Sequence, residues 1–373
     1  EIAHRIGYPI VIRPSYVLGG RAMMIVYDDE EMAEYFALHV GKQKLEHPVL
    51  IDKFLENAIE VDVDALSDGE DVYVAGVMEH IEEAGIHSGD SSCVLPPYSL
   101  PAETVAEIER QTVALAKELR VVGLMNIQFA VKDGVVFILE VNPRASRTAP
   151  FVSKATGVPL PRLATQVMLG KTLKELDPWS MRRSGYVSVK ESVFPFRRFP
   201  GVDILLGPEM RSTGEVMGIA PTFEEAFLKG QWGAGQKLPE GGKVFLSVND
   251  RDKRFVAEVA RQYVDLGFEL LATSGTAGLL AGQGIPSTRV LKVYEGRPNI
   301  VDLIKNGEVS LVINTASGKR TAHDSKAIRQ ATLHYGVPYS TTLSGAKAIA
   351  RAIGAARTTE VRVKSLQEYY KGE

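Results

Sequence analysis

The sequence predicts an α/β chain of two parts, a mixed α+β unit over residues 1–235 and a parallel-sheet domain over residues 236–373. Three observations predict this division. Short apolar runs near the start of the chain are joined by glycine-rich turns, which is typical of antiparallel hairpins. After Gly242, strands and helices alternate, which indicates a parallel sheet covered by helices. The charge also changes: residues 1–235 hold 23 basic and 33 acidic side chains, whereas residues 236–373 hold 20 and 13.

The overall composition is that of a globular protein, with 45% hydrophobic and 24% charged residues. No signal peptide and no membrane-spanning apolar run is recognisable, so we expect a cytoplasmic protein with no membrane partner. The single cysteine, Cys93, excludes an internal disulfide and favours a reducing compartment. No nucleic-acid-binding motif accompanies the basic second part, which instead fits a small phosphate ester. Because Glu1 already lies inside a helical pattern, we expect a piece of a longer protein.

In the first part, apolar spacing and turn residues predict short antiparallel strands with two longer helices. The strand that begins at Ile59 alternates apolar and acidic residues, so we expect it to be half buried. Residues 178–240 are rich in glycine and proline and are expected to be irregular structure packed on the first domain. The predicted elements are a helix closed by Gly7, strands at Tyr8–Arg13, Ala22–Tyr27, Val49–Leu55, Ile59–Asp64 and Val72–Val77, and helices at Asp28–Val40 and Ala102–Leu119.

Two apolar runs on either side of Lys132-Asp133-Gly134 predict a hairpin that carries Gln128, Glu140 and Asn142. A two-residue turn would place Gln128 and Glu140 on opposite faces, whereas a three-residue loop with Gly134 left-handed would place them on the same face. Shared metal binding needs the second register, so we expect the three-residue loop. Oxygen ligands followed by Arg144 and Arg147 suit magnesium-dependent phosphoryl transfer. The alternative is an ordinary edge hairpin with solvated polar residues.

Three further segments of the first part favour a nucleotide. The loop Leu18-Gly-Gly-Arg21, which includes Gly20, could close its backbone N–H groups over phosphates, with Arg13 supplying positive charge. Asp52-Lys-Phe-Leu55 could offer its backbone to an adenine, and Glu60 could hold ribose hydroxyls. Residues 85–90 form a loop of small and polar residues that includes His87. The alternatives are a structural glycine turn, a solvated strand face at Glu60 and a surface histidine.

In the second part, strands are expected at Val244–Val248, Phe268–Ala272, Arg289–Lys292, Val309–Asn314 and Val337–Tyr339. Helices are expected at Lys253–Leu266, Ile300–Lys305, Ser325–His334 and Ser344–Ala352. Ligands of such sheets bind at the carboxyl ends of the strands. Hydroxyls of Ala272-Thr-Ser-Gly-Thr276 and the side chains of Lys253, Lys292 and Asn314 are expected there, which favours a phosphate site over simple helix capping.

These segments together resemble the C-terminal part of the large chain in the carbamoyl phosphate synthase family, over essentially all 373 residues. The resemblance implies a partial ATP-grasp domain at 1–235, with a lid at about 1–75 and the catalytic hairpin and irregular segment at about 76–235. It implies a Rossmann-like, methylglyoxal-synthase-like allosteric domain at 236–373. The motifs that carry it are Arg13-Pro-Ser-Tyr-Val-Leu-Gly-Gly-Arg-Ala-Met23, Met78-Glu-His-Ile-Glu82, His87-Ser-Gly-Asp90, Leu124-Met-Asn126, Glu140-Val-Asn-Pro-Arg144, Pro150-Phe-Val-Ser-Lys-Ala-Thr-Gly-Val158 and Gly207-Pro-Glu-Met-Arg-Ser-Thr-Gly214.

The resemblance implies an ATP-dependent ligase that phosphorylates carbamate to carbamoyl phosphate for arginine and pyrimidine biosynthesis. Its cofactors would be ATP and Mg²⁺ or Mn²⁺, with K⁺ as an additional candidate. Gln128, Glu140 and Asn142 would hold two metal ions, and Arg144 and Arg147 would be catalytic. The nucleotide would be lined by Arg13, Gly20, Lys53, Leu55, Glu60, Gly85, Ile86, His87, Ser88, Gln128 and Glu140, with Lys53 acting through its backbone. The partners would be the N-terminal part of the same large chain and a glutaminase small chain.

By the same resemblance the second part is regulatory. A nucleotide monophosphate would bind Lys253, Thr273, Thr276, Lys292 and Asn314, although Ala316 replaces a second threonine of some members. An ornithine-like effector would bind at the domain junction on Glu82, Asp90, Glu191 and Thr341. Two alternatives stay open: an inactive fragment that serves only as an effector-binding module, and a different ATP-grasp ligase that joins a carboxylate to an amine.

Overall fold

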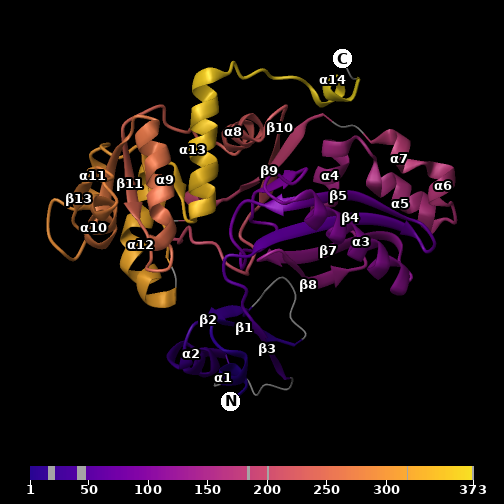
Figure 1. The fold of residues 1–373 in the computed structure, drawn as a ribbon, viewed down its shortest axis with the longest axis horizontal. Helices are drawn as coiled ribbons and strands as arrows, with labels where there is room; N and C mark the ends of the chain where they lie inside the picture. Colours follow the sequence, from indigo (N-terminus) through magenta and orange to yellow (C-terminus); the bar gives the residue numbers. More distant parts are fainter. Residues whose placement is uncertain (16–21, 40–47, 183–184, 200, 317, 372–373) are drawn as a thin grey trace.

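The computed structural model describes residues 1–15, 22–39, 48–182, 185–199, 201–316 and 318–371. These residues form three sheets, of three, seven and five strands. The small sheet and its two helices lie at the N-terminal end, below the seven-stranded sheet, and the five-stranded sheet stands to one side (Figure 1). Within the described residues, no helix combines the length and apolar character needed to cross a bilayer.

The small N-terminal unit, which we call the lid, has the strand order β2-β1-β3 with antiparallel pairing. It consists of α1 (Ile2–Ile6), β1 (Ile10–Pro14), β2 (Met24–Val26), α2 (Asp29–His39) and β3 (Val49–Lys53). Ile10 and Ile12 of the central strand are fully buried beneath both helices, against Ala3 and Tyr35. The predicted elements of this region are therefore confirmed for the described residues.

The seven-stranded sheet has the order β10-β9-β6-β5-β4-β7-β8 and is antiparallel throughout. Its elements are β4 (Ile59–Asp68), β5 (Val72–His80), β6 (Cys93–Leu95), β7 (Val122–Lys132), β8 (Val135–Asn142), β9 (Val187–Val193) and β10 (Gly214–Ala220). The expectation that residues 178–240 are irregular was wrong, because β9 and β10 extend this sheet and are followed by α8 (Phe223–Gly233).

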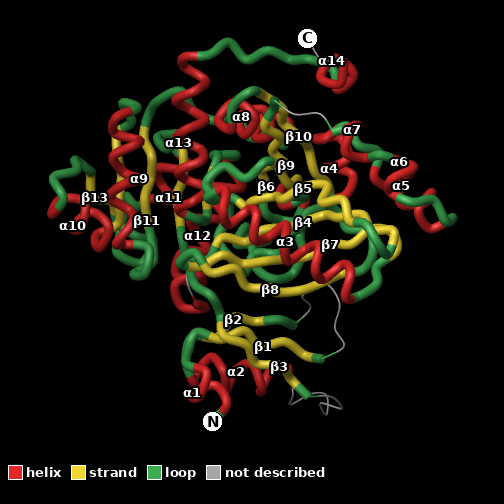
Figure 2. The backbone as a smooth tube through the Cα atoms, turned by 45° about the vertical axis from the view of Figure 1, so that its right-hand side comes forward, coloured by secondary structure: helices red, strands yellow, loops and turns green. Residues whose placement is uncertain are grey.

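Helices cover both faces of this sheet (Figure 2). On one face, α3 (Ala102–Glu118) packs its Ile108 against Val61 and Val63 of β4. On the other, α4 (Ala149–Thr156) and α5 (Leu160–Met168) enclose Leu66. The prediction that β4 is half buried was therefore wrong, since a central strand covered on both sides has no solvated face. The short helices α6 (Leu173–Leu176), α7 (Pro178–Met181) and η1 (Phe196–Arg198) complete this part.

The five-stranded sheet has the order β13-β12-β11-β14-β15, and every pair is parallel, as predicted. Its strands are β11 (Lys243–Ser247), β12 (Glu269–Thr273), β13 (Thr288–Val290), β14 (Leu311–Asn314) and β15 (Tyr339–Ser340). Its helices are α9 (Lys253–Asp265), α10 (Ser274–Gly282), α11 (Ile300–Lys305), α12 (Gly318–Tyr335) and α13 (Leu343–Thr358). One apolar cluster joins α9 and α13 to α8, so the two larger parts share a continuous core.

Four further contacts, made by Arg251 and by the last helix, hold the parts together. Arg251, before α9, lies 3.8 Å over the ring of Tyr27 in the lid and forms a 2.6 Å ion pair with Glu56. The last helix, α14 (Leu366–Lys371), returns to the seven-stranded sheet and its covering helix α4: Tyr369 Oη donates a 3.0 Å hydrogen bond to Ile219 O of β10, and Tyr370 Oη donates one of 2.7 Å to Lys154 O of α4. Figure 1 shows this helix far from the rest of the C-terminal domain.

Candidate nucleotide and metal site

The hairpin of β7 and β8 brings Gln128 and Glu140 directly opposite each other, as predicted, but by a different route. Lys132 pairs with Val135, so the turn has two residues, Asp133 and Gly134, both with positive φ, and the expected three-residue loop was wrong. Because a two-residue turn alone would put the two side chains on opposite faces, a further residue is needed. Leu139 supplies it as a β-bulge, since Gln128 pairs with Glu140 and the adjacent Phe129 pairs with Ile138.

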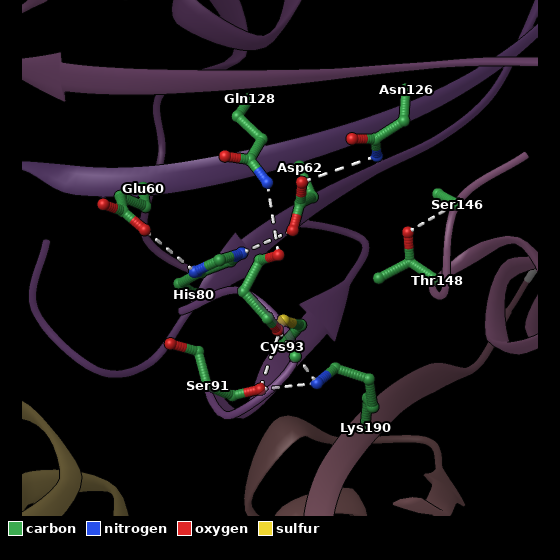
Figure 3. A network of polar contacts seen from close by, with 12 residues as sticks. Glu60, Asp62, His80, Ser91, Cys93, Asn126, Gln128, Ser146, Thr148 and Lys190 are labelled. Atoms are coloured by element: carbon green, nitrogen blue, oxygen red, sulfur yellow. Dashed lines mark hydrogen bonds and ion pairs between the residues drawn. The ribbon is translucent and has the colours of Figure 1, made fainter. Parts of the chain in front are cut away.

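The side chains of Gln128, Glu140 and Asn142 fit a hard cation. The amide nitrogen of Gln128 donates a 3.2 Å hydrogen bond to Ser88 Oγ, which leaves the amide oxygen for a ligand (Figure 3). The oxygen of Asn142 accepts a 3.1 Å hydrogen bond from Arg144 and keeps a second lone pair. Within the described residues no cluster of three or more His, Cys, Asp or Glu could hold a metal ion. Carboxylate and amide oxygens with phosphate oxygens are the donors Mg²⁺ prefers.

A cavity of about 1400 Å³ lies between the lid and the seven-stranded sheet. It contains almost all residues predicted to contact a nucleotide, a metal ion or the transferred group, although these come from four separate stretches of the chain. The loop that carries Gly20 lies outside the described residues. The predicted residues that line the cavity are Arg13, Lys53, Leu55, Glu60, Gly85, Ile86, His87, Ser88, Gln128, Glu140, Asn142, Arg144 and Arg147.

The lid contributes Arg13 and Lys53 to this cavity in different ways. Arg13 Nε donates a 3.1 Å hydrogen bond to Asp52, and both side chains remain well exposed. Lys53 Nζ donates hydrogen bonds of 2.8 Å and 2.9 Å to the carbonyls of Gly7 and Tyr8. The side chain of Lys53 therefore ties β3 to the end of α1, a structural role that the sequence did not suggest.

Glu60 is held at the rim of the cavity instead of lying on a solvated strand face. Its Oε1 accepts a 3.0 Å hydrogen bond from Gly85 N, and its Oε2 lies 3.5 Å from His80 Nδ1. His80 Nε2 lies 2.9 Å from Asp62, which also lines the cavity (Figure 3). Burial opposes a charge on His80, but Cys93 and the neighbouring carboxylates raise its pKa well above the usual range. The Gly85 N–H thus orients Glu60 toward this loop, with His80 beside it.

The loop of residues 85–90 is fastened from two sides. His87 Nδ1 accepts a 2.9 Å hydrogen bond from Gly89 N, and burial lowers the pKa of His87, so its ring is neutral. Lys190, on β9, is fully buried and donates to Ser88 O at 3.3 Å and to Ser91 O at 2.6 Å. Sequence reasoning missed both Lys190 and His80, because Lys190 lay in the stretch expected to be irregular and His80 lay beyond the end of the strand predicted at Val72–Val77.

Arg144 and Arg147 follow β8 and lie on the cavity wall. Arg144 donates to Asn142 Oδ1 and, at 3.0 Å, to Ala145 O. Arg147 contacts the sulfur of Met210. Two cations therefore stand beside the metal-ligand candidates, as the order of residues along the chain predicts.

The residues predicted at the domain junction are only partly brought together. Ser92 Oγ donates to Glu191 at 2.7 Å and to Glu82 at 3.2 Å, so these two carboxylates share one hydroxyl. Burial and the nearby Glu82 raise the pKa of Glu191 to about 8. The Asp90 carboxylate is instead engaged by two backbone N–H groups, those of Arg211 and Ser212. Thr341 lies on the wall of a second cavity, of about 840 Å³, between the lid and the C-terminal domain.

The residues predicted to hold an effector phosphate lie at or just after the carboxyl ends of β11 to β14. Thr273 ends β12, Thr276 lies in the first turn of α10 and Asn314 ends β14, and all three are buried. Lys253 begins α9, and its Nζ lies close to Gly275. Lys292 follows β13, and its backbone N–H is bonded to Glu295.

Comparison with known families divides the chain in the same way. Residues 1–176 match the family described as "Carbamoyl-phosphate synthase L chain, ATP binding domain". Residues 256–341 match the family described as "MGS-like domain". The first match covers the lid, the metal-ligand hairpin and the two arginines, and the second covers most of the five-stranded sheet.

Similar proteins extend these matches to the whole chain. The carbamoyl phosphate synthase large chains of Gemmatimonas aurantiaca and Archaeoglobus fulgidus are each 55% identical, over 99% and 100% of this chain and 34% of their own length. A protein of Methanocaldococcus jannaschii described as the C-terminal section of that large chain is 53% identical, over 99% of this chain and 61% of its own. This chain thus spans about a third of the two full large chains. Along its whole length the chain is similar to the C-terminal part of the carbamoyl phosphate synthase large chain, and it carries the ATP-binding domain of that chain together with an MGS-like domain.

Proposed function

We propose that the ATP-binding part transfers the γ-phosphoryl group of ATP to carbamate, giving carbamoyl phosphate and ADP. The observation that carries this proposal is the placement of Glu140 and Gln128 opposite each other in a cavity that also contains Arg144 and Arg147. The family matches, which describe residues 1–176 as an ATP-binding domain, support the nucleotide.

In this reaction a carbamate oxygen forms a bond to the γ-phosphorus while the bond from that phosphorus to the bridging oxygen of ADP breaks. Carbamate is itself the nucleophile, so the protein needs to bind and orient the two reactants. Mg²⁺ held by Gln128, Glu140 and Asn142 would neutralise phosphate oxygens. Arg144 and Arg147 supply guanidinium groups that can pair with the moving phosphoryl oxygens and the carbamate.

The remaining cavity residues bind the nucleotide in this proposal. Arg13 offers charge from the lid, the segment at Lys53–Leu55 offers backbone groups, and Glu60 offers a carboxylate edge. The loop from Gly85 to Ser88 completes the pocket and is held by Glu60 and Lys190. Fixing this loop in advance lowers the entropy that nucleotide binding would otherwise cost.

We further infer that residues 236–373 regulate the reaction. A nucleotide monophosphate would bind at the ends of β11 to β14, where Thr276 and the N-terminus of α10 suit a phosphate. An ornithine-like amine would bind near Glu82 and Glu191, whose shared buried site suits an ammonium group. The supply of carbamate would come from the rest of the large chain with a glutaminase partner.

ATP formation from ADP and carbamoyl phosphate tests the proposal in the intact protein. Glu140→Gln should lower turnover by at least ~10³-fold, on the scale of losing a main charge-stabilising group. Asp133→Asn is the matched control, because it changes an acidic residue at the turn of the same hairpin, where asparagine tolerates the positive φ. Normal turnover in Glu140→Gln would refute the metal role. Product from the intact protein but none from residues 1–373 alone would support an effector-binding role for the isolated piece.

A further inference from the structure

A buried carboxylate lies beneath the loop that carries Arg144 and Arg147. Asp64, on β4, is 1% exposed. It accepts hydrogen bonds from Ser146 Oγ at 2.6 Å, Thr148 Oγ1 at 2.7 Å and Asn126 Nδ2 at 3.1 Å. Both of its oxygens are used, since Ser146 and Asn126 bond to Oδ1 and Thr148 bonds to Oδ2. A single side chain thus holds two hydroxyls that are two residues apart.

Those hydroxyls lie on either side of Arg147. Ser146 Oγ also accepts a 2.9 Å hydrogen bond from Ala149 N at the start of α4, and it lies 3.0 Å from Thr148 Oγ1 (Figure 3). Thr148 is the residue from which α4 begins. The main chain at Arg147 is therefore fixed on both sides to β4, a central strand, while Arg147 itself lies on the cavity wall.

A charged Asp64 at this buried position lowers the stability of the folded protein. The three groups that donate to Asp64 are neutral, and the nearest acidic neighbour in the strand is Asp62. Burial, together with Asp62, raises the pKa of Asp64 to about 6 in spite of these hydrogen bonds. A buried carboxylate without a cation destabilises a folded protein at neutral pH. An isosteric amide would avoid that charge, so stability alone does not account for an aspartate at this position.

We propose that Asp64 is a positioning residue for phosphoryl transfer, which fixes the loop at Ser146 and Thr148 so that the guanidinium of Arg147 meets the transferring group. This inference rests on the proposed role of Arg147. Each hydroxyl donates to a different oxygen of Asp64, and an amide at this position would present a donor to one of them. Misplacement of a catalytic group by about 1 Å can cost ~10²-fold in rate.

The test is a double-mutant cycle in the intact protein, with ATP formation from ADP and carbamoyl phosphate as the assay. Asp64→Asn should lower kcat ~10-fold or more, with the KM for ADP changed less than ~2-fold and the unfolding midpoint equal or higher. In the Arg147→Ala background the same substitution should have less than ~2-fold further effect, because the group it positions is gone. Equal loss in both backgrounds, or unchanged kcat, would overturn the inference.

A second pair of variants, at Thr148, distinguishes loss of the hydrogen bond to Asp64 from a general loss of packing. Thr148→Val keeps the shape but removes the hydroxyl and should lower kcat, whereas Thr148→Ser should restore it. Thr156→Val is the matched control, since its buried hydroxyl donates to Val152 O at 2.7 Å and accepts from Val158 N at 3.4 Å, and it should leave kcat unchanged. If Arg147→Ala alone keeps normal turnover, the proposed function fails at this residue. If Arg147→Ala lowers turnover and Asp64→Asn lowers it by the same further factor in both backgrounds, only the positioning role of Asp64 is refuted.

Discussion

Arg329 of α12 donates two hydrogen bonds, each 2.6 Å long, to the carboxylate of Asp203, which lies between β9 and β10. The same guanidinium donates a third, of 3.1 Å, to Asn314 Oδ1 at the end of β14. Arg329 is 1% exposed, and Asp203 is only partly exposed. Asn314, which is predicted to contact an effector, therefore shares the buried Arg329 with the segment that leads to Arg211. The backbone N–H of Arg211 in turn donates to the carboxylate of Asp90.

We predict that Asp203→Ala lowers the free energy of unfolding by about 3 kcal/mol, because it removes two short hydrogen bonds from the buried guanidinium of Arg329. Chemical denaturation of the intact protein measures this change. Glu258→Ala is the control, since it breaks an exposed ion pair with Lys347 and should change the free energy by less than about 1 kcal/mol. Equal effects of the two substitutions would show that the pair with Arg329 is no stronger than a surface ion pair.

Thr276→Ala should weaken binding of a nucleoside monophosphate about tenfold, which corresponds to the loss of one hydrogen bond to a charged phosphate. The hydroxyl lies in the N-terminal turn of α10. Because Thr276 is 1% exposed, the substitution does not change the outer surface of the protein. Calorimetric titration of the intact protein measures the affinity. Thr358→Ala, at the exposed end of α13, serves as the control. Unchanged affinity in Thr276→Ala would remove this residue from the effector site.

The carboxylate pair on Ser92 predicts a pH dependence of stability. Because burial and Glu82 raise the pKa of Glu191 from 4.5 to about 8, the folded state binds an extra proton between these values. The stability that this proton contributes is full below pH 4.5 and is lost as the pH rises through about 8. Glu191→Gln should therefore match the parent protein at pH 5 and be more stable at pH 9, by about 1–2 kcal/mol.

Denaturation at the two pH values checks this prediction. Glu360→Gln is the control, because this exposed carboxylate should give the same difference at both. A Glu191→Gln protein that is less stable than the parent at pH 9 would show that the charged carboxylate is favourable where it stands, through Lys190 or Ser92.

The sequence allowed much of the site to be predicted, since the metal-ligand candidates, the arginines and the nucleotide loop are short contiguous motifs. What it could not show was the β-bulge that brings Gln128 and Glu140 to the same face of the hairpin. Strand periodicity assumes one residue per position, so the bulge at Leu139 was invisible, and the shared face of Gln128 and Glu140 was attributed to the wrong turn. His80 and Lys190 were missed for a related reason, because their partners lie far along the chain.

Long-range pairing also explains the errors in the fold. The acidic alternation of β4 is typical of a solvated face, but β5 and β7 flank the strand and donors such as Thr148 cover Asp64. The glycines of β10 weaken any strand signal, and only pairing with β9 makes it a strand. The parallel domain was predicted more accurately because β11, β12 and β14 are compact, mostly apolar runs, each followed by a helix.

The glycine at position 218 gives the last prediction. Gly218 lies on β10 where α8 crosses it, and a Cβ there would lie 1.9 Å from Ala226 O and 2.7 Å from Gly230 N. Both are backbone atoms of the helix, so no side chain can move aside. Gly218→Ala should therefore separate α8 from the sheet and lower the free energy of unfolding by more than about 4 kcal/mol. The control is Gly214→Ala in the same strand, whose Cβ would approach nothing closer than Val193 Cβ at 4.0 Å. Since α8 also packs against α13, hydrogen exchange should show loss of protection in both helices for Gly218→Ala only, and equal protection in the two variants would contradict this close packing.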